Sequence, residues 1–244
     1  MTLLNNEVMK HKELITDILP KGVDKQKFLL SVEKEINRNQ LLQKCSPASV
    51  TEAIIKAAKI GVDLDAEKGQ AFLVTYKNCC KMILGYKGLI MLALRNKDIV
   101  HITTHNVHEG DELIYQEGLT PKLEHFPNLK APGELIAIYA IATLPHQKGK
   151  LFKLMSIEEL KQIQEKQEIN MSPQKLEHCG WRRFPEAMQK KTVIRKLLNE
   201  IHTSSTFQDT LTEDFLAETQ DQDTDEVNEN PKDEDKGKKY EMFA

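Results

Sequence analysis

The spacing of apolar residues predicts helices at the start of the chain. Within residues 1–40, apolar side chains recur at helical spacing in two runs, which Pro20-Lys21-Gly22 separates. A further helix is expected to begin with Ser46 as its cap and Pro47 at its first position, where the missing N–H of proline costs nothing. Gly61 is well placed to end that helix.

The middle of the chain changes to a period typical of strands. Residues 70–76 and 81–84 flank Lys77-Asn78, which predicts a β-hairpin, and residues 86–96 then read as a helix. Further strands are expected at 99–107, 112–115, 122–126, 135–143 and 151–155. Because both faces of 135–143 are apolar, that strand is expected to be central in its sheet.

Helices return late in the chain. Ser156 and Glu159 have the spacing of a capping box, which predicts a helix to about Glu168, and Phe184 to Ile201 reads as a longer helix. Strands bracketed by helices, mostly without βαβ alternation, favour an α+β fold with a small, mainly antiparallel sheet packed with helices. We expect a helical N-terminal region at 1–40, a core at 41–204 and an acidic, disordered tail at 205–244.

Charge divides the chain into a basic body and an acidic end. Residues 1–206 carry a net charge of +6, and the segment from Phe207 onward carries −9. A basic body suits a polyanion such as nucleic acid, although an ordinary solvated surface would look the same. Residues 220–239 cannot bury enough apolar surface to fold. The apolar residues 240–244 could be a partner-binding motif, or a chance cluster on a solubilising tail.

Several classes of protein are disfavoured. Four cysteines in 244 residues do not form a disulfide framework, and the first 20 residues lack the apolar core of a signal peptide. No apolar run is long enough to cross a bilayer, so we expect a soluble, intracellular protein with no membrane partner. No Walker A motif is present to hold the phosphates of ATP, and no nucleophile motif indicates an enzyme.

Two groups of residues could hold a metal ion. Asp63, Asp65 and Glu67 alternate and would share a face if extended, as a metal-dependent nuclease would need, but such a cluster is more often a solvated turn. His101, His105 and His108 could suggest zinc, yet in a strand His108 falls on the opposite face from the other two. We assign no metal ligand from either group.

Two basic segments that contain aromatic residues are better candidates for a nucleic-acid site. The first, from the hairpin to the next helix, contributes Tyr76, Lys77, Lys81, Tyr86 and Lys87. Its lysines would neutralise phosphates, and Gly85 and Gly88 would let a DNA backbone approach closely. The alternative is that Tyr86 packs in the core and that the lysines only decorate the surface.

The second segment lies on and before the last long helix. Its candidates are Trp181, Arg182, Lys190, Lys191, Thr192 and Arg195. Lys191, Thr192 and Arg195 share one helix face, which we expect to be polar and opposite the buried face. Trp181 could either stack on a base or cap the core. Aromatic stacking together with a cationic groove is the physical basis of single-strand binding without sequence preference.

These segments also resemble the RecT family of phage and prophage recombination proteins. The resembling blocks, in the same order, are Cys45–Val50, Gly69–Leu73 with Tyr76-Lys77-Asn78, Gly85–Ile90, Gly118–Leu123 and Lys190–Arg195. The resemblance covers about residues 40–202. It implies a single-strand annealing protein that forms a ring or filament on DNA, binds single strands and annealed duplex, and uses no nucleotide hydrolysis. It also implies a bacterial cytoplasmic setting, beside a 5′→3′ exonuclease. The acidic tail could compete with DNA for the groove, or it could recruit a single-strand-binding protein or a nuclease.

Carried over residue by residue, the resemblance places Lys191, Thr192 and Arg195 in a basic groove with Tyr86 and Lys87. Trp181 matches an aromatic residue that stands before the last helix of the family. No cofactor is expected to be required, although Mg²⁺ could modulate binding. The first 40 residues are a candidate for subunit contacts, or else they complete the core. A passive single-strand-binding protein and, less favoured, a metal-dependent nuclease remain the alternatives.

Overall fold

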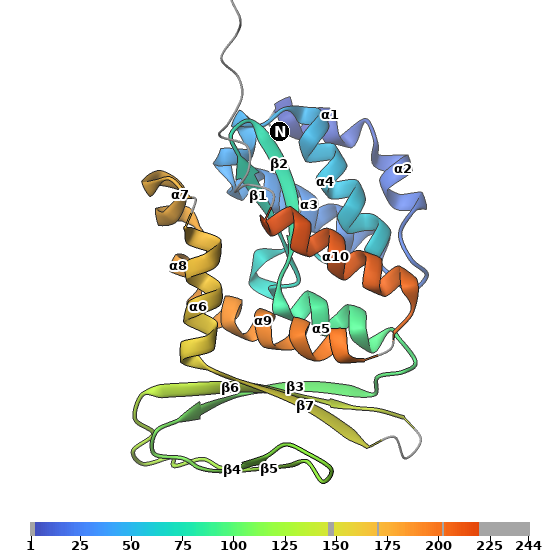
Figure 1. Ribbon diagram of the computed structural model, residues 1–244. Helices are drawn as coiled ribbons and strands as arrows, with labels where there is room; N and C mark the ends of the chain where they lie inside the picture. Colours follow the sequence, from blue (N-terminus) through green and yellow to red (C-terminus); the bar gives the residue numbers. More distant parts are fainter. Residues whose placement is uncertain (1–2, 146–148, 170, 202, 220–244) are drawn as a thin grey trace, which may run out of the picture.

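The computed structural model describes residues 3–145, 149–169, 171–201 and 203–219. A three-stranded sheet lies beneath a layer that contains α5 and α9, and a second group of helices lies beyond that layer (Figure 1). The α+β class with small antiparallel sheets is confirmed. Within the part of the chain described, no helix is long and apolar enough to span a membrane.

The N-terminal region forms helices that belong to the main core. Its helices are α1 (Leu3–Met9), α2 (Lys12–Asp17) and α3 (Lys25–Arg38); the 3₁₀ turn η1 (Gln40–Lys44) and α4 (Pro47–Ile60) follow. Val8, Ile15 and Ile36 are fully buried in the same apolar cluster as the later helices and strands. These helices therefore help to complete the core.

The ends of α4 follow the chemistry expected from its sequence. The Ser46 hydroxyl accepts a hydrogen bond from the backbone N–H of Ser49 at 3.3 Å, and Pro47 occupies the first turn. Gly61 ends the helix in the left-handed conformation, at φ 65°. Both predicted boundaries are confirmed.

A β-hairpin then leads into a helix that bears on the candidate site. After the 3₁₀ turn η2 (Ala66–Lys68), strand β1 (Ala71–Tyr76) pairs with β2 (Cys79–Leu84) in antiparallel register, and α5 (Tyr86–Leu94) follows. Lys77 lies in the turn with a positive φ of 52°. The predicted hairpin and helix are both present.

The larger sheet has the order β3-β6-β7, with both pairs antiparallel. Its strands are β3 (His101–His108), β6 (Leu135–Thr143) and β7 (Lys150–Ser156). The prediction that 135–143 is a central strand is confirmed. The separate hairpin of β4 (Glu112–Gln116) and β5 (Lys122–Phe126) lies on the side of this sheet away from the helices (Figure 1).

A polar contact fastens this hairpin to the sheet. The His125 ring lies 3.1 Å from the Tyr139 hydroxyl of β6 and 3.0 Å from the Asp111 carboxylate. Asp111 also accepts hydrogen bonds from the backbone N–H groups of His108 and Asn128. Chiefly for that reason, the pKa of Asp111 is held well below its usual value.

The C-terminal helices are α6 (Ile157–Glu168), α7 (Pro173–His178), α8 (Gly180–Arg183), α9 (Pro185–Glu200) and α10 (Ser205–Thr219). Three of them, α7, α8 and α10, were not predicted. The predicted capping box of Ser156 and Glu159 is present. The expectation of a disordered tail from residue 205 is wrong for 205–219, because α10 buries Phe207 and Leu211 in the core. The rest of the predicted tail, 220–244, lies outside the described residues.

Candidate nucleic-acid interface

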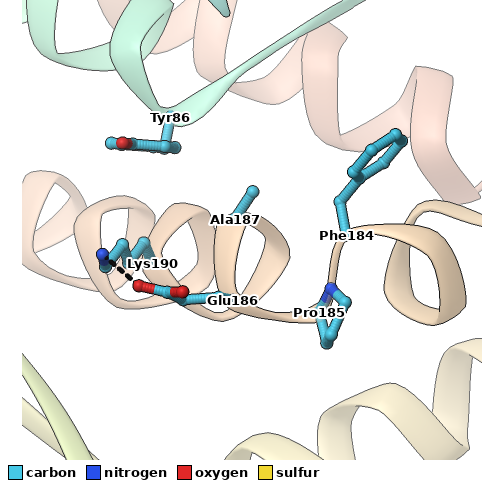
Figure 2. A pocket seen from close by; sticks show the side chains of 6 residues that line it. All are labelled: Tyr86, Phe184, Pro185, Glu186, Ala187 and Lys190. Carbon is cyan, nitrogen blue, oxygen red and sulfur yellow. Dashed lines mark hydrogen bonds and ion pairs between the residues drawn. The ribbon is translucent and has the colours of Figure 1, made fainter.

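The start of α9 and the start of α5 form the two sides of a cavity of about 420 Å³. Tyr86 enters it from α5, while Phe184 and Lys190 enter it from the α9 side (Figure 2). Pro185, Glu186 and Ala187 complete the lining. The cavity therefore offers two aromatic side chains and one lysine toward the same space.

The charges at this cavity are balanced. The Lys190 ammonium pairs with Glu186 at 2.5 Å, and the Asn106 side-chain amide donates to the same carboxylate at 3.0 Å. The bond from Lys190 is the largest cause of the lowered pKa of Glu186. Because the lysine is already paired, the cavity suits an aromatic base better than a bare phosphate.

Of the two roles left open for Trp181, the structure supports the cap on the core, and Phe184 is the exposed aromatic residue. Trp181 is 3% exposed, and its indole N–H donates to the Gln167 side chain at 2.6 Å, so it caps the core. Phe184 is 57% exposed and caps α9 immediately before Pro185. Its ring lies 5.3 Å from the guanidinium of Arg183. Of the two aromatic residues, Phe184 is the one accessible to a nucleic-acid base.

Arg182 is also committed to a contact within the protein. Its guanidinium makes bonds of 3.0 and 2.5 Å to Glu168 at the end of α6. Hydrogen bonding to Glu168 is the largest cause of the raised pKa of Arg182. Arg182 fastens α8 to α6 and thereby supports Trp181 and the entry to α9.

The face of α9 that carries Lys191, Thr192 and Arg195 is covered by α10. Lys191 is 2% exposed and Thr192 is buried, with its hydroxyl bonded to the Met188 carbonyl at 2.9 Å. The expectation that this face is open to solvent is wrong. Two carboxylates of α10, Asp214 and Glu218, pair with both Lys191 and Arg195.

The electrostatics of Arg195 reflect this pairing. Burial works to lower the pKa of its guanidinium, but the negative charges of Glu218 and Asp214 outweigh burial and raise the pKa above its usual value. The Arg195 Nε atom is buried and has no hydrogen-bond partner among the described residues. One nitrogen of the guanidinium, Nη2, therefore bonds to both carboxylates, while no described residue accepts from the Nε–H.

A second cavity, of about 470 Å³, lies where α6, α9 and α10 meet. Arg195 lines it together with Thr192, and Lys166 of α6 and Lys196 of α9 add two exposed cations. Sequence reasoning missed both lysines. Lys196 directly follows Arg195, but Lys166 lies on another helix, and only the fold brings it to this cavity.

The first predicted segment divides into two places. Tyr76, Lys77 and Lys81 lie at the turn of the hairpin, with the Lys81 ammonium 5.3 Å from the centre of the Tyr76 ring. Tyr86 lies beyond the other end of β2, about 20 Å away for a six-residue strand. Only Tyr86 of this segment joins Lys190 and Phe184 at the first cavity, and exposed Lys87 follows it on α5.

Gly85 and Gly88 serve the protein's own packing. A Cβ on Gly88 would lie 2.0 Å from the Gln70 carbonyl oxygen, and one on Gly85 would lie 2.2 Å from that of Gly69. The close approach that these glycines permit is therefore between α5 and the start of β1. It fixes Tyr86 at the cavity.

The candidate metal ligands form contacts of other kinds. Asp63 pairs with Lys68, and Asp65 pairs with Lys34 at 2.9 Å. His105 stacks on Tyr139, while His108 lies 3.6 Å from Asp111. Among the described residues, no group of three or more His, Cys, Asp or Glu side chains could hold a metal ion.

Comparison with known proteins agrees with the family resemblance. Protein RecT of Escherichia coli (strain K12) is 30% identical over 202 residues, which cover 79% of this chain and 72% of that protein. The uncharacterized protein YqaK of Bacillus subtilis (strain 168) is 29% identical over 175 residues, or 71% of this chain and 58% of YqaK. Residues 26–234 match the RecT family, and the chain belongs to that family.

Proposed function

We propose that this chain binds single-stranded DNA along α9 and anneals complementary strands without ATP, in homologous recombination. The cavity of Tyr86, Phe184 and Lys190 carries the proposal, because it combines the exposed Phe184 ring with the partly buried Tyr86 ring and one lysine. Membership of the RecT family supports the same function. The absence of a Walker A motif from the sequence fits a reaction that uses no nucleotide.

Annealing sets a physical requirement that this surface can meet. The Watson–Crick edges of the bound strand must stay free to test a second strand, so affinity has to come from phosphates and base faces. Phe184 offers a face for stacking, and Lys87, Lys166 and Lys196 are exposed cations that can neutralise phosphates. None of these contacts depends on base identity.

The wider setting is part of the proposal. We infer that the protein acts as a homo-oligomer, a ring or a helical filament, on both single strands and the annealed duplex. A 5′→3′ exonuclease would supply the single strands, and a single-strand-binding protein would share them, in the cytoplasm of a bacterium that carries the phage or prophage. No cofactor is required, and Mg²⁺ acts at most as a modulator.

The decisive test is annealing of two complementary dye-labelled oligonucleotides with no nucleotide added, beside a non-complementary pair. Fast pairing that depends on complementarity is the expected result. A protein that binds the strands without accelerating their pairing would instead be a passive single-strand-binding protein. Loss of DNA that depends on Mg²⁺ would favour a nuclease.

A further inference from the structure

The helix α10 brings negative charge onto the face of α9 that the sequence marked for DNA. Asp214 Oδ2 lies 2.8 Å from the Lys191 ammonium and 2.9 Å from Arg195 Nη2. Glu218 also contacts both cations, with Oε2 2.8 Å from Arg195 and Oε1 on Lys191. Two carboxylates thus neutralise the buried Lys191 and the largely buried Arg195, and they lie one turn apart on the same helix.

Carboxylates and phosphates recognise lysine and arginine through the same charge-assisted hydrogen bonds. Asp214 and Glu218 therefore present to Lys191 and Arg195 the chemistry that two phosphates of a DNA strand would present. The site is built for anions and is occupied by anions of the chain itself.

The fit of α10 to Arg195 is incomplete. Both carboxylates bond to the same nitrogen, Nη2, and Nε is buried without a partner among the described residues. A guanidinium binds a planar or tetrahedral oxyanion best with two parallel N–H groups. A phosphate that used Nε together with Nη2 would satisfy a donor that α10 leaves unpaired.

The two halves of α10 are attached differently. Phe207 and Leu211, in the first half, are buried in the apolar core. In the second half, Phe215 and Leu216 are 44% and 43% exposed. Ion pairs, the bond from the Leu84 N–H to Asp214 at 2.8 Å, and the Phe215 ring 5.4 Å from the Arg195 guanidinium attach this half to the protein. An anionic competitor can replace the carboxylates in these ion pairs, whereas it cannot replace buried apolar side chains.

A path for the competitor lies beside the helix. The second cavity is lined by Arg195 and Thr192 on one side and by Leu211, Thr212 and Phe215 of α10 on another. The exposed cations Lys166 and Lys196 line the same cavity. A DNA backbone held by these two lysines would lie next to the carboxylates that it must replace.

We propose that Lys191 and Arg195 form a phosphate site for single-stranded DNA, which α10 occupies with Asp214 and Glu218 until DNA displaces the second half of that helix. This proposal rests on the proposed single-strand binding. It makes α10 an internal competitor that weakens binding by short or isolated strands. Phe207 and Leu211 keep the helix tethered after its second half has left.

The first test is the double variant Asp214→Asn and Glu218→Gln in the full chain. The Asp214→Asn change keeps a side-chain oxygen that can accept the Leu84 N–H, while the two changes together remove both negative charges. Binding to a fluorescent oligo(dT) should tighten at low salt. The slope of log affinity against log salt follows the number of phosphates contacted, which is the same in both proteins once α10 is displaced. The variant should therefore gain affinity while this slope changes little.

The matched control is Asp209→Asn and Glu213→Gln. These residues are exposed on the same helix, and the changes remove the same negative charge without touching Lys191 or Arg195. The control should leave the affinity of the wild type for oligo(dT) unchanged. An equal gain in both double variants would show a general charge effect and would overturn the proposal.

Amide hydrogen exchange of the unmodified protein gives a measurement that does not depend on how the variants fold. Saturating oligo(dT) should accelerate exchange in residues 212–218, while residues 207–211 change less. Unchanged or slower exchange across 212–218, in a complex shown to form, would overturn the proposal. Failure of the wild type to bind oligo(dT) at all would instead overturn the proposed function.

Discussion

Replacement of Phe184 by Ala tests whether the first cavity receives a DNA base. Stacking of a base on an aromatic side chain is worth about 1–3 kcal/mol. Because Arg183 lies over the Phe184 ring, one face is left for a base, and we expect about 1–2 kcal/mol, or roughly a five- to 30-fold weaker Kd. Since the side chain is 57% exposed, the free energy of unfolding should fall by only about 1 kcal/mol.

The assay is fluorescence anisotropy with a labelled oligo(dT) and with an abasic strand of equal length. The difference between wild type and Phe184→Ala should be present on oligo(dT) and absent on the abasic strand, because only stacking has been removed. Phe126→Ala is the control, since Phe126 is similarly exposed, at 55%, on the separate hairpin. A folded Phe184→Ala protein that binds oligo(dT) like the wild type would refute the stacking role.

Three other predictions concern packing, pH and metal ions. Gly88→Ala should lower the free energy of unfolding by about 2–3 kcal/mol in urea titration, because the new Cβ would overlap the Gln70 carbonyl. This loss should exceed the gain from the better helix propensity of Ala. An unchanged midpoint of urea unfolding would mean that the backbone before β1 can shift to make room for the Cβ. Because hydrogen bonds lower the pKa of Asp111 below 3.8, its contribution is present above that pH and lost as the pH falls through the lowered value. Asp111→Asn should therefore lower the melting temperature more near neutral pH than in acid, and an equal loss at both pH values would contradict this. Annealing should persist in EDTA, and its abolition would show that a divalent ion is required.

Local chemistry explains why much of the fold could be predicted from the sequence. The caps of α4, the capping box of α6 and the turn at Lys77 each depend on residues within a few positions of one another. Such local patterns can be recognised in the sequence without knowledge of the tertiary structure. The central position of β6 was equally readable, because a strand with two apolar faces must be covered on both.

The candidate site was harder to predict because long-range contacts determine which of its side chains are exposed. Trp181 and Phe184 are three residues apart, and only packing against α6 decides which of them is buried. The position of Pro185 was the available signal, since it starts α9 and leaves Phe184 just outside the helix. Likewise Phe207 and Leu211 are four residues apart in an otherwise polar segment, a short helical pattern that the acidic composition obscured.

The late position of α10 in the chain has a consequence for folding. The bond from the Leu84 N–H to Asp214 joins residues 130 positions apart, so α10 can dock only after nearly the whole core has been made. During synthesis, which proceeds from the N-terminus, α9 leaves the ribosome before the helix that neutralises it. For that interval the nascent protein exposes Lys191 and Arg195 to ribosomal RNA and other polyanions. The time that α10 needs to leave the ribosome and dock therefore sets how long the nascent chain can bind nucleic acid nonspecifically.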